Sequence, residues 1–308
     1  MPVLVVLFRR ADLTRAVLKA VDSARPNKIY ISIDGPRADR LIDIQGVKEV
    51  REVVRTFPFN CPVEVRQLEN NMGAGGHVRS AVNWLFEHEE QGIILEDDCI
   101  PTSAFFAYAR HSLERFADSE VMNIAGFSPV PSSIVGTSGI RTSRYPMTWG
   151  WATWRRAWEV YTDDLSDWRS KLPFSKLEAI GDGDPWFATY WSRNFDKLSN
   201  GSSDVWDYQW VYSTWVHGGK GVFPNVNLVQ NRGFGRESTH SFFARKTYAL
   251  ASVESDGYAN SRLTLNLASV RAADAFMHRH FYRVGSAYPA TSAARSLGRS
   301  IVNSTLRN

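Results

Sequence analysis

Short apolar runs alternate with longer amphipathic segments in the first part of the chain. The apolar runs resemble strands and cover residues 3–8, 28–35, 63–69 and 92–96. The segments that follow them have helical spacing and cover residues 12–24, 41–55, 77–89 and 103–116. This rhythm predicts an α/β fold with a central, mostly parallel sheet and right-handed crossovers. We expect Asp12 to cap the first helix and residues 70–76 to form a loop.

The pattern changes after about residue 120. Tryptophan becomes frequent, as in TWGWATWRRAWEVY (148–161) and DVWDYQWVYSTWVHGG (204–219), and we expect irregular connections and short helices there. Residues 241–308 predict a basic, helical C-terminal extension with a net charge of +6, against +4 for the whole chain. Its final segment, 292–308, has the pattern of a basic amphipathic helix. Two hypotheses stay open: weak association with an anionic inner membrane, at about 1 kcal/mol for each basic residue, or packing against the main domain.

Composition narrows the class of protein. The 308 residues are 44 % hydrophobic and 22 % charged, so the chain is expected to bury a core. A charge of +4 is too small to indicate nucleic-acid binding. Two cysteines predict neither a disulfide framework nor a zinc cluster, and they favour a reducing compartment. The apolar start is too short for a signal peptide, and no run of ~18 apolar residues follows, so we expect a cytoplasmic protein.

Polar residues end three of the predicted strands: Asp34, Asn70-Asn71 and the triplet Glu96-Asp97-Asp98. Ligands of parallel α/β sheets bind beyond the carboxyl ends of the strands. Adjacent carboxylates repel one another, and a divalent cation removes that repulsion. Mg²⁺ and Mn²⁺ prefer carboxylate oxygens together with substrate phosphates. The triplet therefore predicts a cation site, whereas the simpler interpretation is a solvated loop that caps the helix over 103–116.

A dinucleotide site is a further alternative. GAGGHV (73–78) follows a strand and opens a helix, and Glu96 lies at the expected distance along the chain. The fingerprint requires a third glycine where Val78 stands, and a ribose needs one acid rather than three. These departures disfavour hydride transfer.

Five motifs in series carry a family resemblance: ISIDGPR (31–37), LEDD (95–98), WGWATWRRAW (149–158), WDYQW (206–210) and FPNVNLVQNRGFGRESTH (223–240). Together they resemble GT-A-fold glycosyltransferases, most closely the N-acetylglucosaminyltransferase I type and its bacterial relatives. The resemblance implies a GT-A (Rossmann-like) catalytic domain over residues 1–240, with a donor half over about 1–120 and an acceptor half over about 121–240. It implies transfer of a sugar from a nucleotide-sugar, a UDP-sugar in first place, to a glycan, lipid-linked or protein acceptor, with Mn²⁺ or Mg²⁺ as cofactor.

The resemblance also implies roles for single residues. It places metal contact at the last acid of the triplet, Asp98, and recognition of uracil N3–H at Asp34, although Asp34 also fits an ordinary turn. We expect Asp97 to face hydroxyls of the donor's ribose or sugar, and Glu96 either to do likewise or to orient Asp97. The resemblance makes His240 a second candidate metal ligand. Further candidates for donor binding lie at strand ends, at a helix start or in glycine-bearing loops, and each also has a purely structural interpretation. They are Phe8, Arg9, Arg37, Asn71, Gly73, Arg79, Trp149, Gly150, Trp151, Arg232 and Arg236.

The acceptor hydroxyl must lose a proton as it attacks, and a carboxylate can take that proton. Asp207 is flanked by Trp206, Tyr208 and Trp210, and aromatic walls suit the apolar faces of sugars. We predict Asp207 as the base, which implies inversion at the anomeric carbon; the alternative is an aspartate that merely starts a helix in an aromatic core. Two other functions remain: a nucleotidyltransferase, whose glycine-rich loop with lysine is missing from FRRADLTR (8–15), and a non-catalytic carbohydrate-binding protein.

Overall fold

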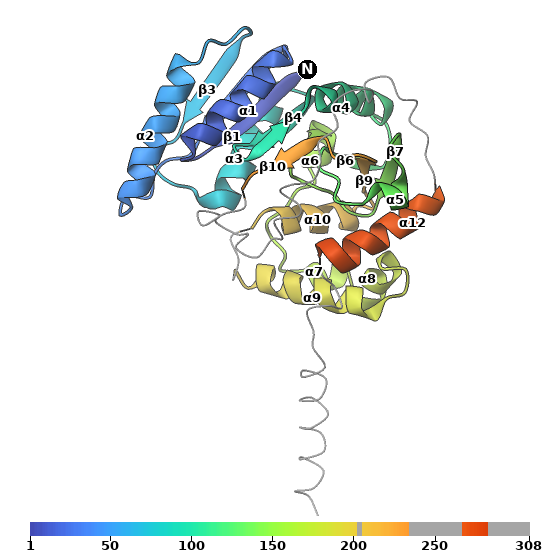
Figure 1. The fold of residues 1–308 in the computed structure, drawn as a ribbon. Helices are drawn as coiled ribbons and strands as arrows, with labels where there is room; N and C mark the ends of the chain where they lie inside the picture. The colour runs from blue at the N-terminus through green and yellow to red at the C-terminus, as the bar shows by residue number, and fades with distance from the viewer. Residues whose placement is uncertain (202–204, 234–266, 283–308) are drawn as a thin grey trace, which may run out of the picture.

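The computed structural model describes residues 1–201, 205–233 and 267–282. A central sheet with the strand order β3-β2-β1-β4-β8-β6-β9-β7 runs through it, and β10 and β5 form a separate antiparallel pair (Figure 1). The strands are β1 (Pro2–Leu7), β2 (Lys28–Ile33), β3 (Val63–Gln67), β4 (Gln91–Glu96), β5 (Cys99–Pro101), β6 (Val121–Ala125), β7 (Ile140–Ser143), β8 (Trp151–Trp154), β9 (Lys220–Pro224) and β10 (Val229–Asn231).

The first four strands of the sheet are parallel. β1 pairs with β2 on one side and with β4 on the other, and β3 lies beyond β2. The strand order therefore reverses between β1 and β4, which is the position where open α/β sheets bind ligands. The prediction of a Rossmann-like α/β fold with a mostly parallel sheet is confirmed by this topology.

Four long helices connect or follow these strands: α1 (Ala11–Ser23), α2 (Leu41–Thr56), α3 (Gly73–His88) and α4 (Ser103–Arg115). Figure 1 shows α1 and α2 side by side. Two local predictions were wrong. Arg10, not Asp12, occupies the position before the first helix, and α3 begins at Gly73 rather than at residue 77. The side chain of Asn71 accepts a hydrogen bond from the N–H of Gly73 at 3.2 Å, which offsets the low helix propensity of the glycines.

The sheet continues into the second half of the chain, for which the sequence predicted irregular connections and short helices. β8 is antiparallel to both β4 and β6, β6 is parallel to β9, and β7 is antiparallel to β9. The helices here are mostly short, as predicted: α5 (Ser132–Val135), α6 (Arg155–Trp158), α7 (Trp168–Lys171), α8 (Phe174–Ile180), α9 (Pro185–Ser199) and α10 (Asp207–Val216). All four residues of β8 are buried, so the strand lacks the alternation by which a half-buried strand is recognised.

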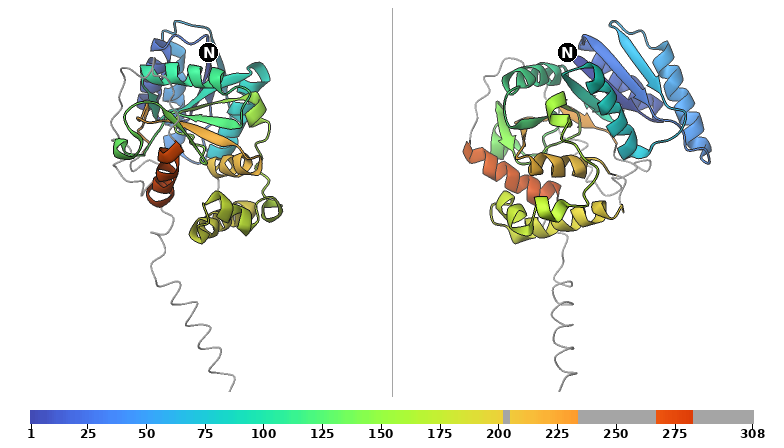
Figure 2. Two further views of the ribbon diagram at one scale, coloured as in Figure 1. Left: turned by 90° about the vertical axis from the view of Figure 1, so that its right-hand side faces the viewer. Right: turned by 180° about the vertical axis from the view of Figure 1, so that it is seen from behind.

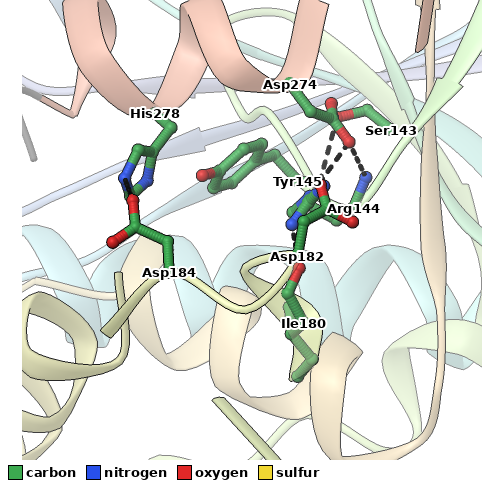
Figure 3. A network of polar contacts seen from close by, with 8 residues as sticks. All are labelled: Ser143, Arg144, Tyr145, Ile180, Asp182, Asp184, Asp274 and His278. Carbon is green, nitrogen blue, oxygen red and sulfur yellow. Dashed lines mark hydrogen bonds and ion pairs between the residues drawn. The ribbon is translucent and has the colours of Figure 1, made fainter. Parts of the chain in front are cut away.

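Part of the predicted C-terminal extension packs against the main domain. It comprises α12 (Leu267–Phe276), which lies against β7 and α5, and a π-helical turn, η2 (Met277–Phe281), which follows it (Figure 2). The buried Asp274 of α12 accepts hydrogen bonds from Ser143 Oγ at 2.5 Å and from Arg144 Nε at 3.1 Å, and His278 contacts Asp184 at 3.1 Å (Figure 3). The remainder of the extension, including the basic segment 292–308, lies outside the described residues, so its membrane association stays a prediction. No helix in the described part of the chain is long and apolar enough to cross a membrane.

Candidate active site

Arg10 lies between two of the three acids at the reversal point of the sheet. Arg10 comes after β1, and Asp97 and Asp98 come directly after β4. β1 and β4 are neighbours in the sheet. The guanidinium donates to Asp97 through Nε at 3.2 Å and through Nη2, and Nη2 also donates to Asp98 Oδ2 at 2.9 Å. The side chain of Asp97 is buried, whereas that of Asp98 is 16 % exposed. Asp98 is therefore the more accessible of these two carboxylates to an incoming ligand.

The acids hold more negative charge than one guanidinium neutralises. Burial, followed by the charges of Asp98 and Asp97, raises the pKa of Glu96 to about 8. Burial also raises the pKa of Asp97 to about 6, although Arg10 and the backbone N–H of Phe8 act to lower it. Carboxylates whose charged forms are disfavoured in this way are typical of sites that bind a cation or move a proton.

Asp207 belongs to this acidic site although it is far away in the sequence. It is the first residue of α10, and its Oδ1 accepts a hydrogen bond from the N–H of Tyr208 at 3.0 Å. Its charge contributes to the raised pKa of Glu96, after burial and the two nearer acids. Trp206 and Trp210, on either side of it in the sequence, are buried. Asp207 therefore starts a helix beside buried tryptophans, as one of the two interpretations expected, and its role as the base stays a prediction.

The loop after β10 closes over Asp98. β10 pairs with β5, which begins directly after the triplet, and the N–H of Arg232 donates to the carbonyl oxygen of Asp98 at 2.8 Å. A Cβ atom at Gly233 would lie 2.2 Å from Oδ2 of Asp98, so a larger residue there would displace this carboxylate or the loop. The contact of Arg232 is made by its backbone. Arg236 and His240 lie outside the described residues, and their predicted roles stay predictions.

The predicted cation contact at Asp98 stays a prediction. Among the described residues, no group of three or more His, Cys, Asp or Glu side chains is arranged to hold a metal ion. Mg²⁺ sites of nucleotide-dependent enzymes commonly use one or two carboxylates, with substrate phosphates and water as the other ligands. A cation at Oδ2 of Asp98 would compete with Arg10 for that oxygen.

Asp34 organises the loop that follows β3. Its Oδ1 accepts hydrogen bonds from the backbone N–H groups of Gly35, at 2.9 Å, and Met72, at 3.0 Å, and its Oδ2 accepts one from Asn71 Nδ2 at 2.8 Å. The carboxylate is buried. Asp34, Asn71 and Gly73 therefore lie together at the carboxyl ends of β2 and β3, as predicted, and the uracil contact of Asp34 remains a prediction.

Two of the predicted donor-binding arginines share a buried acid that the sequence analysis missed. Asp43 of α2 pairs with Arg9 Nη1 at 3.0 Å and with Arg37 Nε. The guanidinium carbons of Arg9 and Arg37 lie 5.9 and 5.7 Å from the ring centroid of Phe8. These arginines are part of a structural ion-pair cluster on the side of β1 that faces α2. One of the two positive charges is offset by Asp43.

Arg79 lies at a cavity of about 440 Å³ between α3 and the segment that starts with α6. It forms an ion pair with Asp163, which lines the same cavity. The ring of Tyr161 also lines it. Burial is the largest cause of the raised pKa of Tyr161; the charge of Arg79 acts to lower this pKa and that of Asp207 to raise it. The ring centroid of Tyr161 lies 6.5 Å from that of Trp210 in α10. We call this space the α3–α6 cavity.

The three residues of the WGW motif differ in position. Trp151 is 1 % exposed and packs in a tryptophan cluster, with its ring centroid 5.7 Å from that of Trp210, so its side chain belongs to the core rather than to a sugar pocket. Trp149 is half-buried, and its centroid lies 5.4 Å from that of Phe281 in η2. Gly150 has a φ of +65°, and a Cβ there would lie 2.8 Å from a methyl of Val229.

Sequence reasoning missed Arg10 and Asp43, and each had a signal. Arg9 and Arg10 are adjacent after a strand, so their side chains tend to point to opposite sides. This spacing favours an arrangement in which one of the two reaches the neighbouring strand end. Asp43 precedes Val47 and Val50 at helical spacing, so it lies on the buried stripe of α2. An acid on a buried stripe requires a cationic partner, and Arg9 and Arg37 fill that role in the structure.

Comparison with protein-family models and with curated proteins gave no match. Among solved structures, the chain is similar to a UDP-glucose pyrophosphorylase complexed with UDP-glucose, at 8 % identity and a TM-score of 0.32, over 53 % of this chain and 80 % of that one. It is also similar to 4-diphosphocytidyl-2C-methyl-D-erythritolsynthase from Anaerococcus prevotii DSM 20548, at 7 % identity and a TM-score of 0.34, over 91 % and 96 %. Likeness of this size does not distinguish between activities.

Proposed function

We propose that this protein is a metal-dependent, inverting glycosyltransferase that uses a nucleotide-sugar, with a UDP-sugar as the first candidate. One observation carries the proposal. Arg10 holds Asp97 and Asp98 together at the reversal point of the strand order, where open α/β sheets bind ligands, and the charge of Asp207, the predicted base, acts on Glu96 beside them. A base and a cation site must both face the anomeric carbon in a single-displacement transfer, and these two sets of residues are far apart in the sequence.

Asp98 would hold the divalent cation, since it is the more accessible partner of Arg10. A cation bound there offsets the negative charge that grows on the departing diphosphate. Asp97 is buried and held by Arg10, so it is suited to a fixed hydrogen bond with a hydroxyl of the donor. Arg10 keeps the two carboxylates together in the absence of a ligand and limits their repulsion.

Asp207 would take the proton of the acceptor hydroxyl. In this step the acceptor oxygen bonds to the anomeric carbon, the bond between that carbon and the diphosphate oxygen breaks, and the proton moves to the carboxylate of Asp207. The attacking oxygen and the departing diphosphate lie on opposite faces of the sugar, so the configuration inverts. The acceptor itself is a glycan, a lipid-linked glycan or a protein side chain.

Calorimetric titration of the full chain with UDP, with and without Mn²⁺, tests the donor site. We expect UDP to bind only with Mn²⁺ present, and Asp98→Ala to weaken this binding at least tenfold while its far-UV circular dichroism is unchanged. Asp118→Ala is a suitable control because it removes an exposed acid outside the site. Equal affinities of the parent and Asp98→Ala for UDP and Mn²⁺ would refute the assignment of Asp98.

The reaction products separate this proposal from its alternatives. Glycosyl transfer or slow donor hydrolysis releases UDP from a UDP-sugar, whereas a nucleotidyltransferase releases pyrophosphate from a nucleoside triphosphate. A panel of nucleotide-sugars, followed by detection of both products, therefore distinguishes the two enzymes. A non-catalytic carbohydrate-binding protein would release neither product and would bind sugars without UDP or Mn²⁺.

A further inference from the structure

β3 forms one open end of the central sheet. Within the described residues it pairs with β2 alone, whereas α12 lies against β7 at the opposite end of the sheet. Figure 1 shows β3 at the outer end of the sheet. An edge strand presents N–H and C=O groups to which the strand of another chain can pair. The free edge of β3 is therefore a candidate interaction surface.

Alternate residues of β3 direct their backbone groups to this open edge. The carbonyl oxygen of Pro62 accepts a hydrogen bond from the N–H of Ile29 at 2.9 Å, and the N–H of Leu68 donates to the carbonyl oxygen of Ile33 at 2.9 Å. The even-numbered positions of the strand thus bond to β2, and consecutive residues of a strand alternate in direction. The residues whose N–H and C=O groups point to the open edge are Val63, Val65 and Gln67.

The two charged side chains of β3, Glu64 and Arg66, share one face of the sheet. Glu64 pairs through Oε2 with Lys28 Nζ at 2.7 Å, which leaves Oε1 for a second cation. Arg66 Nη2 donates to Ser32 Oγ at 3.0 Å, but its Nε is buried without a hydrogen-bond partner. Burial lowers the pKa of Arg66, the direction expected of a cation whose charge is not offset. Within the described residues, Arg66 forms no ion pair.

A second copy of the chain fits this edge in one antiparallel register. When the two strands pair about Val65, the residues that exchange hydrogen bonds are those whose backbone groups are open. Glu64 of each copy then lies directly opposite Arg66 of the other, in non-hydrogen-bonded positions, where side chains approach most closely. A shift of the register by two residues places Glu64 opposite Glu64, or Arg66 opposite Arg66, and like charges in these positions are destabilising. The charges of β3 thus select a single register and a copy of the same strand.

Apolar side chains accompany the open edge. Val65 and Ile44 of α2 are each 41 % exposed. Ile44 lies two helical turns before Arg51, whose Nη2 donates to the carbonyl oxygen of Leu68 at the end of β3. Ile44 is therefore on the face of α2 that is turned toward β3. Pairing about Val65 covers its side chain with that of the second copy.

We propose that this chain forms a symmetric dimer in which the β3 strands of two copies pair antiparallel about Val65 and continue the sheet across the two-fold axis. The paired segment is only five residues long, so the dimer is weak and its population depends on protein concentration. This inference does not rest on the proposed function, and the two are tested by different measurements.

Sedimentation equilibrium of the full-length chain, from about 1 to about 200 µM, tests the inference. The parent should change from monomer to dimer over this range. Val65→Pro should raise the dissociation constant at least tenfold without a change in the far-UV circular dichroism. Proline removes an N–H that points away from β2, so the bonds within the chain remain. Val65→Thr, which keeps this N–H and the size of the side chain, is the matched control and should dimerise like the parent.

Charge reversal tests the register. Glu64→Lys and Arg66→Glu should each weaken the dimer at least tenfold, because like charges then face each other. An equimolar mixture of the two variants should dimerise again, since the charges of one variant are opposite in sign to those of the other. Glu52→Lys is the control: it also reverses an exposed acid that pairs with a basic residue, Arg55, but on α2. It should dimerise like the parent.

A parent that stays monomeric at about 200 µM would overturn the inference and would leave the edge of β3 to a strand of a different protein. A Val65→Pro variant that folds and dimerises as tightly as the parent would overturn it as well, because the dimer would then use another surface. If Arg66→Glu does not fold, Val65→Pro and Glu64→Lys, both at exposed positions, still decide the outcome.

Discussion

The substitution Asp274→Asn removes the charge by which α12 is held against the sheet. Asp274 is 4 % exposed and accepts hydrogen bonds from Ser143 Oγ, from the N–H of Arg144 and from Arg144 Nε (Figure 3). Asparagine has nearly the same size, so the change leaves no cavity. It leaves the largely buried guanidinium of Arg144 without its most buried partner.

The expected loss of stability is about 3 kcal/mol. Removal of one partner of a buried ion pair costs about 3–5 kcal/mol. The lower end of this range applies because Arg144 keeps its contacts with the exposed Asp182 and with the carbonyl oxygen of Ile180. If α12 opens locally, a loss of this size corresponds to amide exchange that is about 100-fold faster in α12.

Urea unfolding followed by far-UV circular dichroism, together with hydrogen exchange of α12, measures this effect. The matched control is Asp196→Asn, because Asp196 also accepts from an arginine, Arg169 Nη2, at 2.7 Å, but in an exposed pair. Exposed pairs contribute about 0–1 kcal/mol. If Asp274→Asn and Asp196→Asn change stability and exchange equally, the buried pair does not hold α12 and the reasoning is wrong.

Three further predictions concern the site and its support. Asp207→Asn should retain binding of UDP and Mn²⁺ and lower the transfer rate about 10²–10⁴-fold, measured as UDP release with an acceptor present, because the proton acceptor is lost; an active variant would contradict the assignment. Gly233→Ala should weaken Mn²⁺-dependent UDP binding without a comparable loss in urea stability, because the added Cβ would lie 2.2 Å from Oδ2 of Asp98; unchanged binding would show that the loop moves away freely. Burial lowers the pKa of His77 to about 3, with Arg66 adding to the effect, from about 6.5 in the unfolded chain. His77 is neutral in both states above pH ~6.5, so its stabilising contribution is complete there. As the pH falls below this value, the unfolded chain binds the proton first, and the free energy of unfolding is lower by about 3 kcal/mol at pH ~4.5. His77→Gln should lack this part of the pH dependence in urea titrations at the two pH values, and an unchanged pH dependence would exclude His77 as its source.

The sequence by itself determined the parallel half of the fold. β1, β2 and β4 are buried on both faces and leave continuous apolar runs, and the helices between them are amphipathic, so local reasoning detects both kinds of element. The same patterns put Asp34, Asn71 and the triplet at strand ends, where a parallel sheet gathers them at one edge. We predicted the start of α3 four residues too late. The contact that supports this start comes from Asn71, and Asn71 is held in turn by Asp34, which follows β2 and is distant in the sequence.

Only the tertiary structure decided which of these residues meet. β8 and β9 are short and buried, and their pairing with distant strands brings α10 and the loop after β10 to the acids. Trp151 has the sequence context of a pocket residue, but its neighbours in space are Trp158 and Trp210, and the burial of large aromatic area keeps it in the core. Arg10 pairs with Asp97 because the two strands are neighbours in the sheet, and neighbourhood in a sheet depends on long-range pairing that no local pattern of apolar and polar residues records.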